Sequence, residues 1–233
     1  MRKPNYGFLQ KVNPYAEGSL DLSKRPTAYR PYPRREPRYE HYVYILDYLE
    51  LGNPSDVHYE HRNQPFVQCI GTKYFTLLEA IPLIGIKIEV MEKIDLSYPS
   101  KLRRLIPITY NELTSLARSN LPEAVKRIIL ENEKTFVEFF NIAEPINIRL
   151  HALELLPEIG RKTMNAILES RRIQPFKSFE DVRNRTKVDP VKVLVERVVR
   201  ELAGGEKYYL FVKPRDQQGL YLGYLEKLYG EFF

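Results

Sequence analysis

The chain has 233 residues, 43% of them hydrophobic, so it is long enough to bury its own core, while its apolar runs fall far short of the roughly 18 residues of a membrane span. Its single cysteine excludes an internal disulfide and a paired-cysteine zinc site, and its first residues lack a secretory signal pattern, so we expect a soluble, cytoplasmic protein without membrane contact. The net charge of +6 is uneven, because basic segments at 1–39 and 146–204 flank an acidic segment at 40–145, which indicates contact with a polyanion at two places.

Residues 1–38 are expected to form an extended arm. They hold six of the seventeen prolines and show no apolar period. Frequent proline fixes φ and removes backbone donors, which favours polyproline II. Interleaved arginine and tyrosine suit phosphate pairing and base stacking, and packing on its own protein or on a protein partner is the alternative. The candidate nucleic-acid contacts of the arm are Arg30, Tyr32, Arg34, Arg35 and Arg38.

Residues 39–108 are expected to form a small β-barrel. Strand-like patterns occur at 42–49, 65–72, 74–81 and 86–94, with a polar loop at 52–64. Four or five short strands with uneven loops favour an OB-like barrel, with an SH3-like barrel as the alternative. Cys69 falls in the second strand and is expected to be a small buried residue.

Residues 109–145 are expected to form a helical connector. Leu113, Leu116 and Ala117 mark a short helix, and Pro122 is expected to open a second one. The second helix carries an apolar stripe that reaches Phe140. The stripe includes Asn132, a candidate for a hydrogen bond between helices, and it indicates core packing rather than a cofactor site.

Residues 147–172 are expected to form a helix, a four-residue turn at 157–160 and a second helix. The stretch resembles the helix-hairpin-helix motif, whose Leu-Pro-Gly-hydrophobic-Gly turn presents backbone N–H groups to a phosphate. Unpaired amides and the positive end of the helix dipole attract the anion. Such a contact reads the nucleic-acid backbone and not the base sequence. The candidate phosphate-binding residues are Ile159, Gly160, Arg161, Lys162 and Thr163.

The turn departs from the motif at Glu158, which stands in place of the first glycine. A carboxylate this close to a phosphate repels it and weakens binding. Two interpretations stay open. The hairpin binds phosphate with the help of Arg161 and Lys162, or it serves only as a packing unit.

A weaker second copy follows at 174–202. Ser178 begins a capping-box-like helix start, and 186–190 forms the turn. Asp189 before Pro190 is expected to cap the last helix with its own carboxylate, which would repel a phosphate. This copy is therefore expected to be structural, and the two copies together predict an all-helical tandem helix-hairpin-helix domain over 146–204.

Short motifs follow the barrel in a fixed order: NELT at 111–114, FVEFFN at 136–141, RLH at 149–151, LLP at 155–157, PFKSFED at 175–181 and KYYLFV at 207–212. In this order the chain resembles, over about residues 39–213, an archaeal family of domains of unknown function. The resemblance implies an α+β fold with an OB-like domain joined to a tandem helix-hairpin-helix domain. It also implies a nucleic-acid or RNA-binding role without a demonstrated activity.

Residues 205–233 complete the chain. Tyr208 to Val212 is expected to be a strand that joins the barrel or caps the helices. Residues after Gly219 follow helical spacing with one apolar face. This helix is expected to dock on its own protein, with a protein partner as the alternative.

No catalytic or metal-binding set is expected. His58 and His61 lie in a polar loop without a third ligand nearby in sequence. Glu89, Glu92 and Asp95 would not share one face of a strand. We therefore expect a non-enzymatic protein without cofactor or metal.

The leading hypothesis is binding of structured RNA, such as ribosomal RNA, by a ribosome- or translation-associated protein through backbone phosphates. One alternative is a DNA-binding protein of repair or replication whose hairpins hold a duplex. The other is a protein-interaction scaffold.

Overall fold

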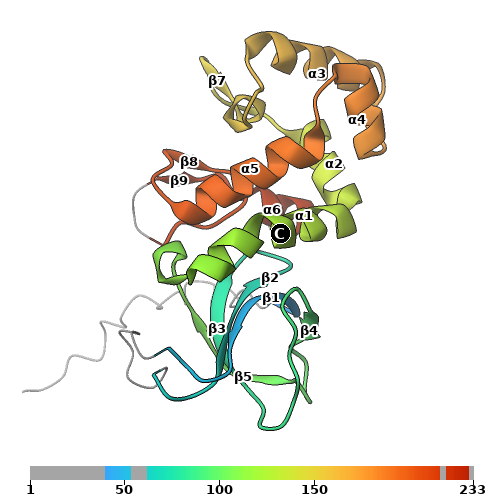
Figure 1. Ribbon diagram of the computed structural model, residues 1–233. Coiled ribbons are helices and arrows are strands. Elements are labelled where there is room, and N and C mark those ends of the chain that lie inside the picture. The colour runs from blue at the N-terminus through green and yellow to red at the C-terminus, as the bar shows by residue number, and fades with distance from the viewer. Residues whose placement is uncertain (1–39, 54–61, 216–218, 231–233) are drawn as a thin grey trace, which may run out of the picture. The chain divides into compact units, whose positions relative to one another are not determined.

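A five-stranded antiparallel sheet comes first in the computed structural model, which describes residues 40–53, 62–215 and 219–230 (Figure 1). Its strands run in the order β4-β1-β2-β3-β5, so β4 and β5 form the two edges of a curled half-barrel. The strands are β1 (Tyr42–Leu49), β2 (Phe66–Gly71), β3 (Leu77–Pro82), β4 (Lys93–Asp95) and β5 (Leu102–Pro107). The predicted arm lies outside the described residues.

The concave face of the sheet holds a small core of its own. Ile94 of β4 and Leu102 of β5 come from opposite edges yet lie in one buried cluster, which identifies this face as the inside of the curl. Cys69 is buried there, and burial raises the pKa of its thiol, so the prediction of a small buried residue is confirmed. The cluster is completed by Val43, Ile45, Val67, Leu78, Ala80 and Ile88.

The convex face is covered by helix α1 (Ser115–Glu131). A buried polar row of Asp47, Gln68 and Glu79 crosses β1, β2 and β3. Thr114 caps α1 and ties it to this row, because its N–H donates to Gln68 Oε1 at 2.8 Å and its hydroxyl donates to Asp47 Oδ2 at 2.6 Å. Tyr44, Leu46, Ile70 and Leu77 project from the same face into a second core that they share with the helices.

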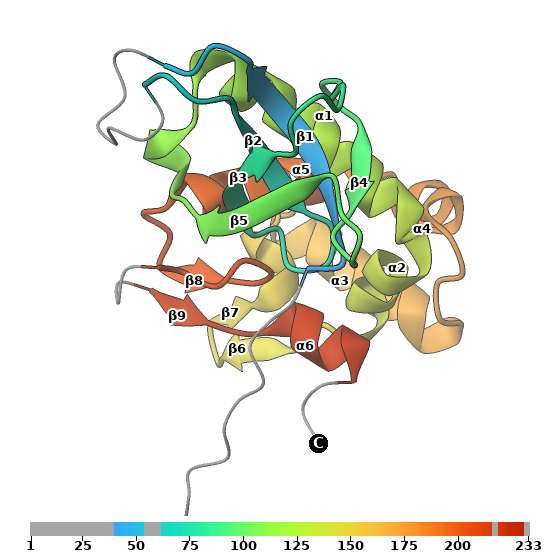
Figure 2. The same cartoon turned by 90° about the horizontal axis from the view of Figure 1, so that it is seen from below.

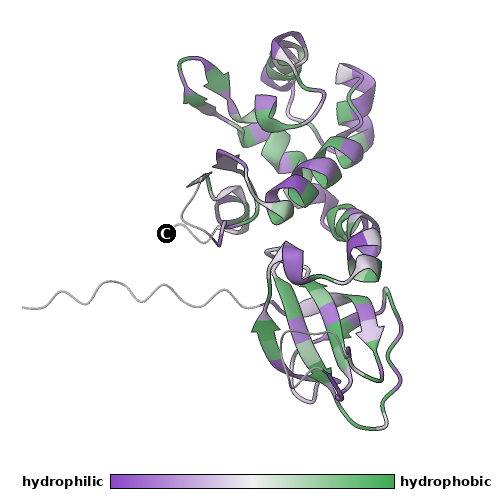
Figure 3. Cartoon of the chain, turned by 60° about the vertical axis from the view of Figure 1, so that its left-hand side comes forward, coloured by the Kyte–Doolittle hydropathy of each residue, from purple (hydrophilic) through white to green (hydrophobic). Residues whose placement is uncertain are grey.

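The rest of the fold is mainly helical. Hydrophobic and hydrophilic residues form alternating bands along its helices (Figure 3), as expected where one side is buried. No helix within the described ranges is both long and apolar enough to cross a membrane. The helical elements are η2 (Tyr110–Glu112), α2 (Glu133–Ile142), η3 (Ala152–Leu155), α3 (Arg161–Ile173), α4 (Phe179–Thr186), α5 (Pro190–Ala203) and α6 (Tyr224–Tyr229), with short strands β6 (Pro145–Asn147), β7 (Leu150–His151), β8 (Tyr208–Tyr209) and β9 (Leu220–Tyr221).

The α+β class with the β part first is confirmed, but the strand expected at 86–94 is wrong except at its end. The N–H of Glu92 donates to the carbonyl of Glu89, and the Glu89 N–H donates to the Glu92 carboxylate, so the chain turns there. Met91 has a φ of 65°. Strand pairing resumes at β4, and β5 supplies the fifth strand from a segment without apolar alternation.

Pro122 does not open a helix, because it lies inside α1. A proline in a helix interior removes a hydrogen bond and costs about 3 kcal/mol. Ala117 and Leu121 before it and Ala124 and Val125 after it are all buried, so packing on the sheet outweighs this cost. The break falls instead at Asn132, whose Nδ2 donates to the Ile128 carbonyl at 2.8 Å rather than to another helix.

The C-terminal segment docks on its own protein, as predicted. Tyr224 and Leu225 of α6 are buried, and the Tyr224 hydroxyl accepts from the Glu144 N–H at 3.0 Å. The strand expected at 208–212 is limited to β8, which pairs with β9 in parallel and does not join the five-stranded sheet (Figure 2).

Candidate nucleic-acid interface

The first helix expected at 147–156 is not an α-helix. Strands β6 and β7 pair antiparallel there, and the short 3₁₀ helix η3 follows. His151 starts η3 by accepting from the Leu153 N–H with Nδ1 at 3.1 Å, while Glu154 accepts from the His151 N–H at 2.9 Å. Pro157 follows closely and limits the length of the helix. His151 therefore caps η3.

Helix α3 begins without a side-chain cap. Its N-cap is Gly160, which has no side chain to offer, and its first turn contains no acidic residue. By contrast, helices α1, α4 and α5 are capped by Thr114, Ser178 and Asp189 respectively. The first amides of α3 therefore keep their capacity to bind an anion.

Most of the predicted phosphate-binding residues surround this helix start. Ile159 is buried, as expected for the hydrophobic residue of the turn, whereas Gly160, Arg161 and Lys162 are exposed and Thr163 is half-buried. Neither Arg161 nor Lys162 forms an ion pair with another residue in the described part of the chain. The arm residues Arg30, Tyr32, Arg34, Arg35 and Arg38 lie outside the described residues.

Glu158 takes the conformation of the glycine that it replaces. Its φ is 63°, in the left-handed region that favours glycine. Its carboxylate lies 2.5 Å from Lys192 Nζ of α5, and both side chains are more than half exposed. The charge that opposes phosphate binding is thus partly compensated by a neighbouring cation.

Replacing Glu158 by glycine or by glutamine tests both effects of this residue. Both variants remove the charge and are expected to raise affinity for duplex RNA two- to fivefold, since a unit charge at 4 Å is worth about 1 kcal/mol in water. E158G also relieves the left-handed strain and should be more stable than E158Q by about 1 kcal/mol. Fluorescence anisotropy and urea unfolding measure the two quantities. Unchanged affinity in both variants would show that no phosphate lies near this turn.

The helix, turn and helix expected after Ser178 are present as α4, a short turn and α5. Asp189 Oδ1 accepts from the Lys192 N–H at 3.3 Å, and Asp189 Oδ2 lies 3.0 Å from the Arg183 guanidinium. Partial burial opposes ionisation of Asp189, but the hydrogen bonds from Lys192 and Arg183 hold its pKa below the usual range. At neutral pH, an ionised carboxylate therefore caps the start of α5.

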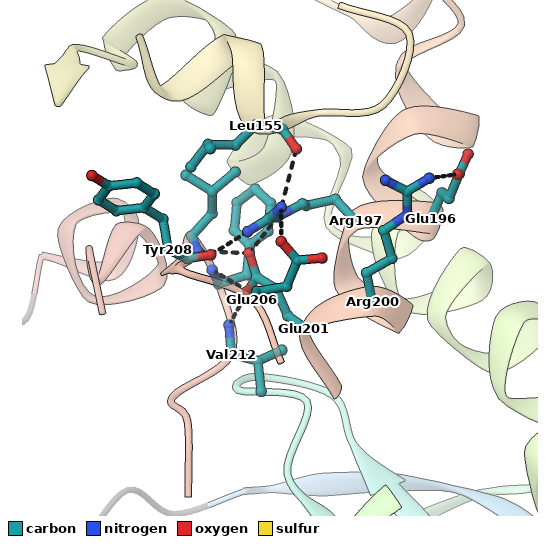
Figure 4. A network of polar contacts seen from close by, with 10 residues as sticks. Leu155, Glu196, Arg197, Arg200, Glu201, Glu206, Tyr208 and Val212 are labelled. Atoms are coloured by element: carbon teal, nitrogen blue, oxygen red, sulfur yellow. Dashed lines mark hydrogen bonds and ion pairs between the residues drawn. The ribbon is translucent and has the colours of Figure 1, made fainter. Parts of the chain in front are cut away.

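A buried ion pair on α5, which the sequence analysis missed, connects this helix to η3 and to the C-terminal segment (Figure 4). Arg197 and Glu201 of α5 are 2.8 Å apart and almost fully buried. Arg197 also donates to the carbonyls of Leu155 and Tyr208, and Glu201 accepts from the N–H groups of Leu210, Phe211 and Val212. The pair therefore holds two segments against α5. One is η3, which lies just before the turn at 157–160, and the other is the C-terminal segment. The sequence signal for this pair is the spacing of the two charged residues, which places them on the same buried face of α5 as Val193, Leu194 and Val198.

The described residues contain no group of three or more His, Cys, Asp or Glu side chains that could hold a metal ion. Glu89 and Glu92 pair with Lys87 and Lys101. His58 and His61 lie outside the described residues.

Comparison with known proteins places the chain in a family. The family model described as protein of unknown function DUF655 matches residues 39–213. The chain belongs to the DUF655 family. The uncharacterized protein MJ0038 of Methanocaldococcus jannaschii is 37% identical over an alignment of 206 residues, and the match covers 85% of this chain and 89% of that protein. The crystal structure of the DUF655 protein Af1531 from Archaeoglobus fulgidus superposes with a TM-score of 0.66 at 38% identity, over 75% of this chain and 100% of that chain.

Proposed function

We propose that this protein binds structured RNA, such as RNA of the ribosome or of the translation machinery, through backbone phosphates and without catalysis. The observation that carries the proposal is the start of α3, where uncapped amides after Gly160 lie beside the exposed cations Arg161 and Lys162. Amides and cations together favour a phosphate over other ligands. The helix-hairpin-helix assignment of this turn, and of the α4 and α5 pair, is part of the proposal.

The half-barrel supports the proposal, because an OB-like barrel is a common scaffold of nucleic-acid-binding proteins. We interpret the sheet, with the order β4-β1-β2-β3-β5 and unpaired edges at β4 and β5, as an OB-like barrel left open between these two strands. OB folds bind oligonucleotides over strands 2 and 3. Here α1 and its partners cover the convex face, where Gln68 is 1% exposed and Glu79 is 5% exposed. We therefore assign the phosphate contact to α3 and not to the sheet.

The double variant R161E/K162E tests this assignment in the full chain. It is expected to weaken binding of a blunt RNA hairpin about tenfold or more and to reduce the slope of log affinity against log salt by about 0.7–0.9 for each phosphate that the variant no longer neutralises. K126E/K134E is the matched control, because it makes the same charge change on exposed positions of α1 and α2. An equal decrease in both variants, or none in R161E/K162E, would refute the assignment.

The kind of nucleic acid is tested by the same assay. Binding of the RNA hairpin should exceed binding of a DNA duplex of the same sequence, and tighter binding of DNA would favour the repair or replication alternative. Deletion of residues 1–38, which carry the arginines and tyrosines of the arm, should reduce the salt slope further.

A further inference from the structure

A cleft of about 530 Å³ opens where three segments of the fold meet. They are the turn from β2 into β3, the connection from β5 through η2, and the end of α5 with the segment that follows it. This volume lies within the range of about 300–1,000 Å³ of small-molecule sites in proteins. The cleft is lined by residues 74–77, 108–111, 201–204, 209 and 212–215.

The floor of the cleft is apolar and its rim is polar. Phe75, Leu77 and Ile108 are buried in the floor, whereas Thr109 and Asn111 are exposed at the rim. Tyr110 also lines the cleft and is half-buried, and the Arg118 guanidinium lies 5.5 Å from the centroid of the Tyr110 ring. This arrangement suits a flat ligand with apolar faces and edges that form hydrogen bonds.

Two cations stand at the rim. Lys213 and Arg215 are exposed, and neither forms an ion pair with another described residue. Partial burial lowers the pKa of Arg215, against the attraction of Glu112. The carboxylate that lines the cleft, Glu201, is already bound by Arg197 and by three backbone N–H groups. The rim therefore has cationic capacity for an anion.

We propose that this cleft binds one unpaired nucleotide of RNA, with the base on the apolar floor beside Tyr110 and the phosphate on Lys213 and Arg215. The combination of an aromatic ring, short polar side chains and cations is the chemistry by which proteins hold unstacked bases. This inference rests on the proposed function and adds a second contact with the RNA. Because of this contact, the protein should bind RNA with a single-stranded end more tightly than a blunt duplex.

The test compares a blunt RNA hairpin with the same hairpin carrying a single-stranded uridine tail, both bound to the full chain. The tail is expected to raise affinity about tenfold. L202W, which fills the cleft from α5, and K213E/R215E, which reverses its rim charge, should each abolish this gain and leave blunt-hairpin binding in place. A photoreactive uridine in the tail should crosslink to Tyr110.

Two controls match these variants. V199W introduces the same side chain at a half-buried position of α5 that lines a different groove, and K126E/K134E makes the same charge change elsewhere. Both should keep the gain from the tail. K213E/R215E changes exposed residues, so it keeps the test valid if L202W fails to fold.

A tail that adds nothing, or a gain that survives L202W and K213E/R215E, would overturn the inference while hairpin binding leaves the proposed function standing. Binding of free uridine monophosphate that L202W abolishes, without a gain from the tail, would overturn it in favour of a free nucleotide. Absence of binding to either hairpin would overturn the proposed function and this inference together.

Discussion

Replacing Arg197 by methionine is expected to lower the free energy of unfolding by about 3–5 kcal/mol, because it leaves the charge of Glu201 buried without its partner. The Glu201 side chain is 0% exposed and that of Arg197 is 3% exposed, so water cannot substitute for the missing guanidinium. The variant also removes donors to the carbonyls of Leu155 and Tyr208, which hold η3 and the C-terminal segment. Urea unfolding followed by circular dichroism measures the change.

The matched control is R200M on the same helix. Arg200 pairs with Glu196 four residues before it, but about half of its side chain is exposed, so its removal should change stability by about 0–1 kcal/mol. R197M/E201Q should recover part of the stability, because the amide is neutral and its oxygen still accepts backbone N–H groups. If R197M and R200M were equally stable, the buried pair would have no structural role.

Replacing Phe211 by alanine is expected to lower the free energy of unfolding by about 3–5 kcal/mol through the cavity that it leaves. Phe211 is fully buried, with its ring centroid 5.0 Å from that of Phe139 and 5.8 Å from that of Phe136, both on α2. It thereby joins the C-terminal segment to the main core. Limited proteolysis should cut F211A faster after residue 205 than the wild type.

I148A is the control for this variant. Ile148 lies between β6 and β7 with 99% of its surface exposed, so its truncation should change stability by no more than about 0.5 kcal/mol. A decrease in F211A no larger than in I148A would mean that the C-terminal segment is not part of the cooperative fold.

The best-predicted elements are those with strong local signals. Ser178 and Asp189 bracket α4 and its turn, because each side chain can satisfy amides of the helix that follows it. The paired strands β1 and β2 were also predictable from a local pattern, because successive residues of a strand point to opposite faces of the sheet. At the candidate interface, the turn sequence placed Ile159 in the core and Gly160 at the start of α3.

The errors occur where a tertiary contact outweighs a local signal. Pro122 is a strong helix-start signal, yet α1 continues on both sides of this proline, because Leu121 and Val125 are buried against the rest of the fold. The alternation at 86–90 predicts a strand, yet the Glu89 to Glu92 turn prevents pairing there. The apolar residues before Pro157 suggested an α-helix, yet the His151 cap and Pro157 allow only η3.

The sequence by itself determined the α+β class, the order of sheet and helices, the capped helices α4 and α5, and the cationic start of α3, because these depend on residues close together in the chain. The tertiary structure decided the rest. It alone brings α1 onto the convex face of the sheet, buries Arg197 with Glu201, and assembles the cleft from residues 74–77, 108–111 and 209–215. These features join segments far apart in sequence, and their formation depends on how the whole core packs, which no local pattern encodes.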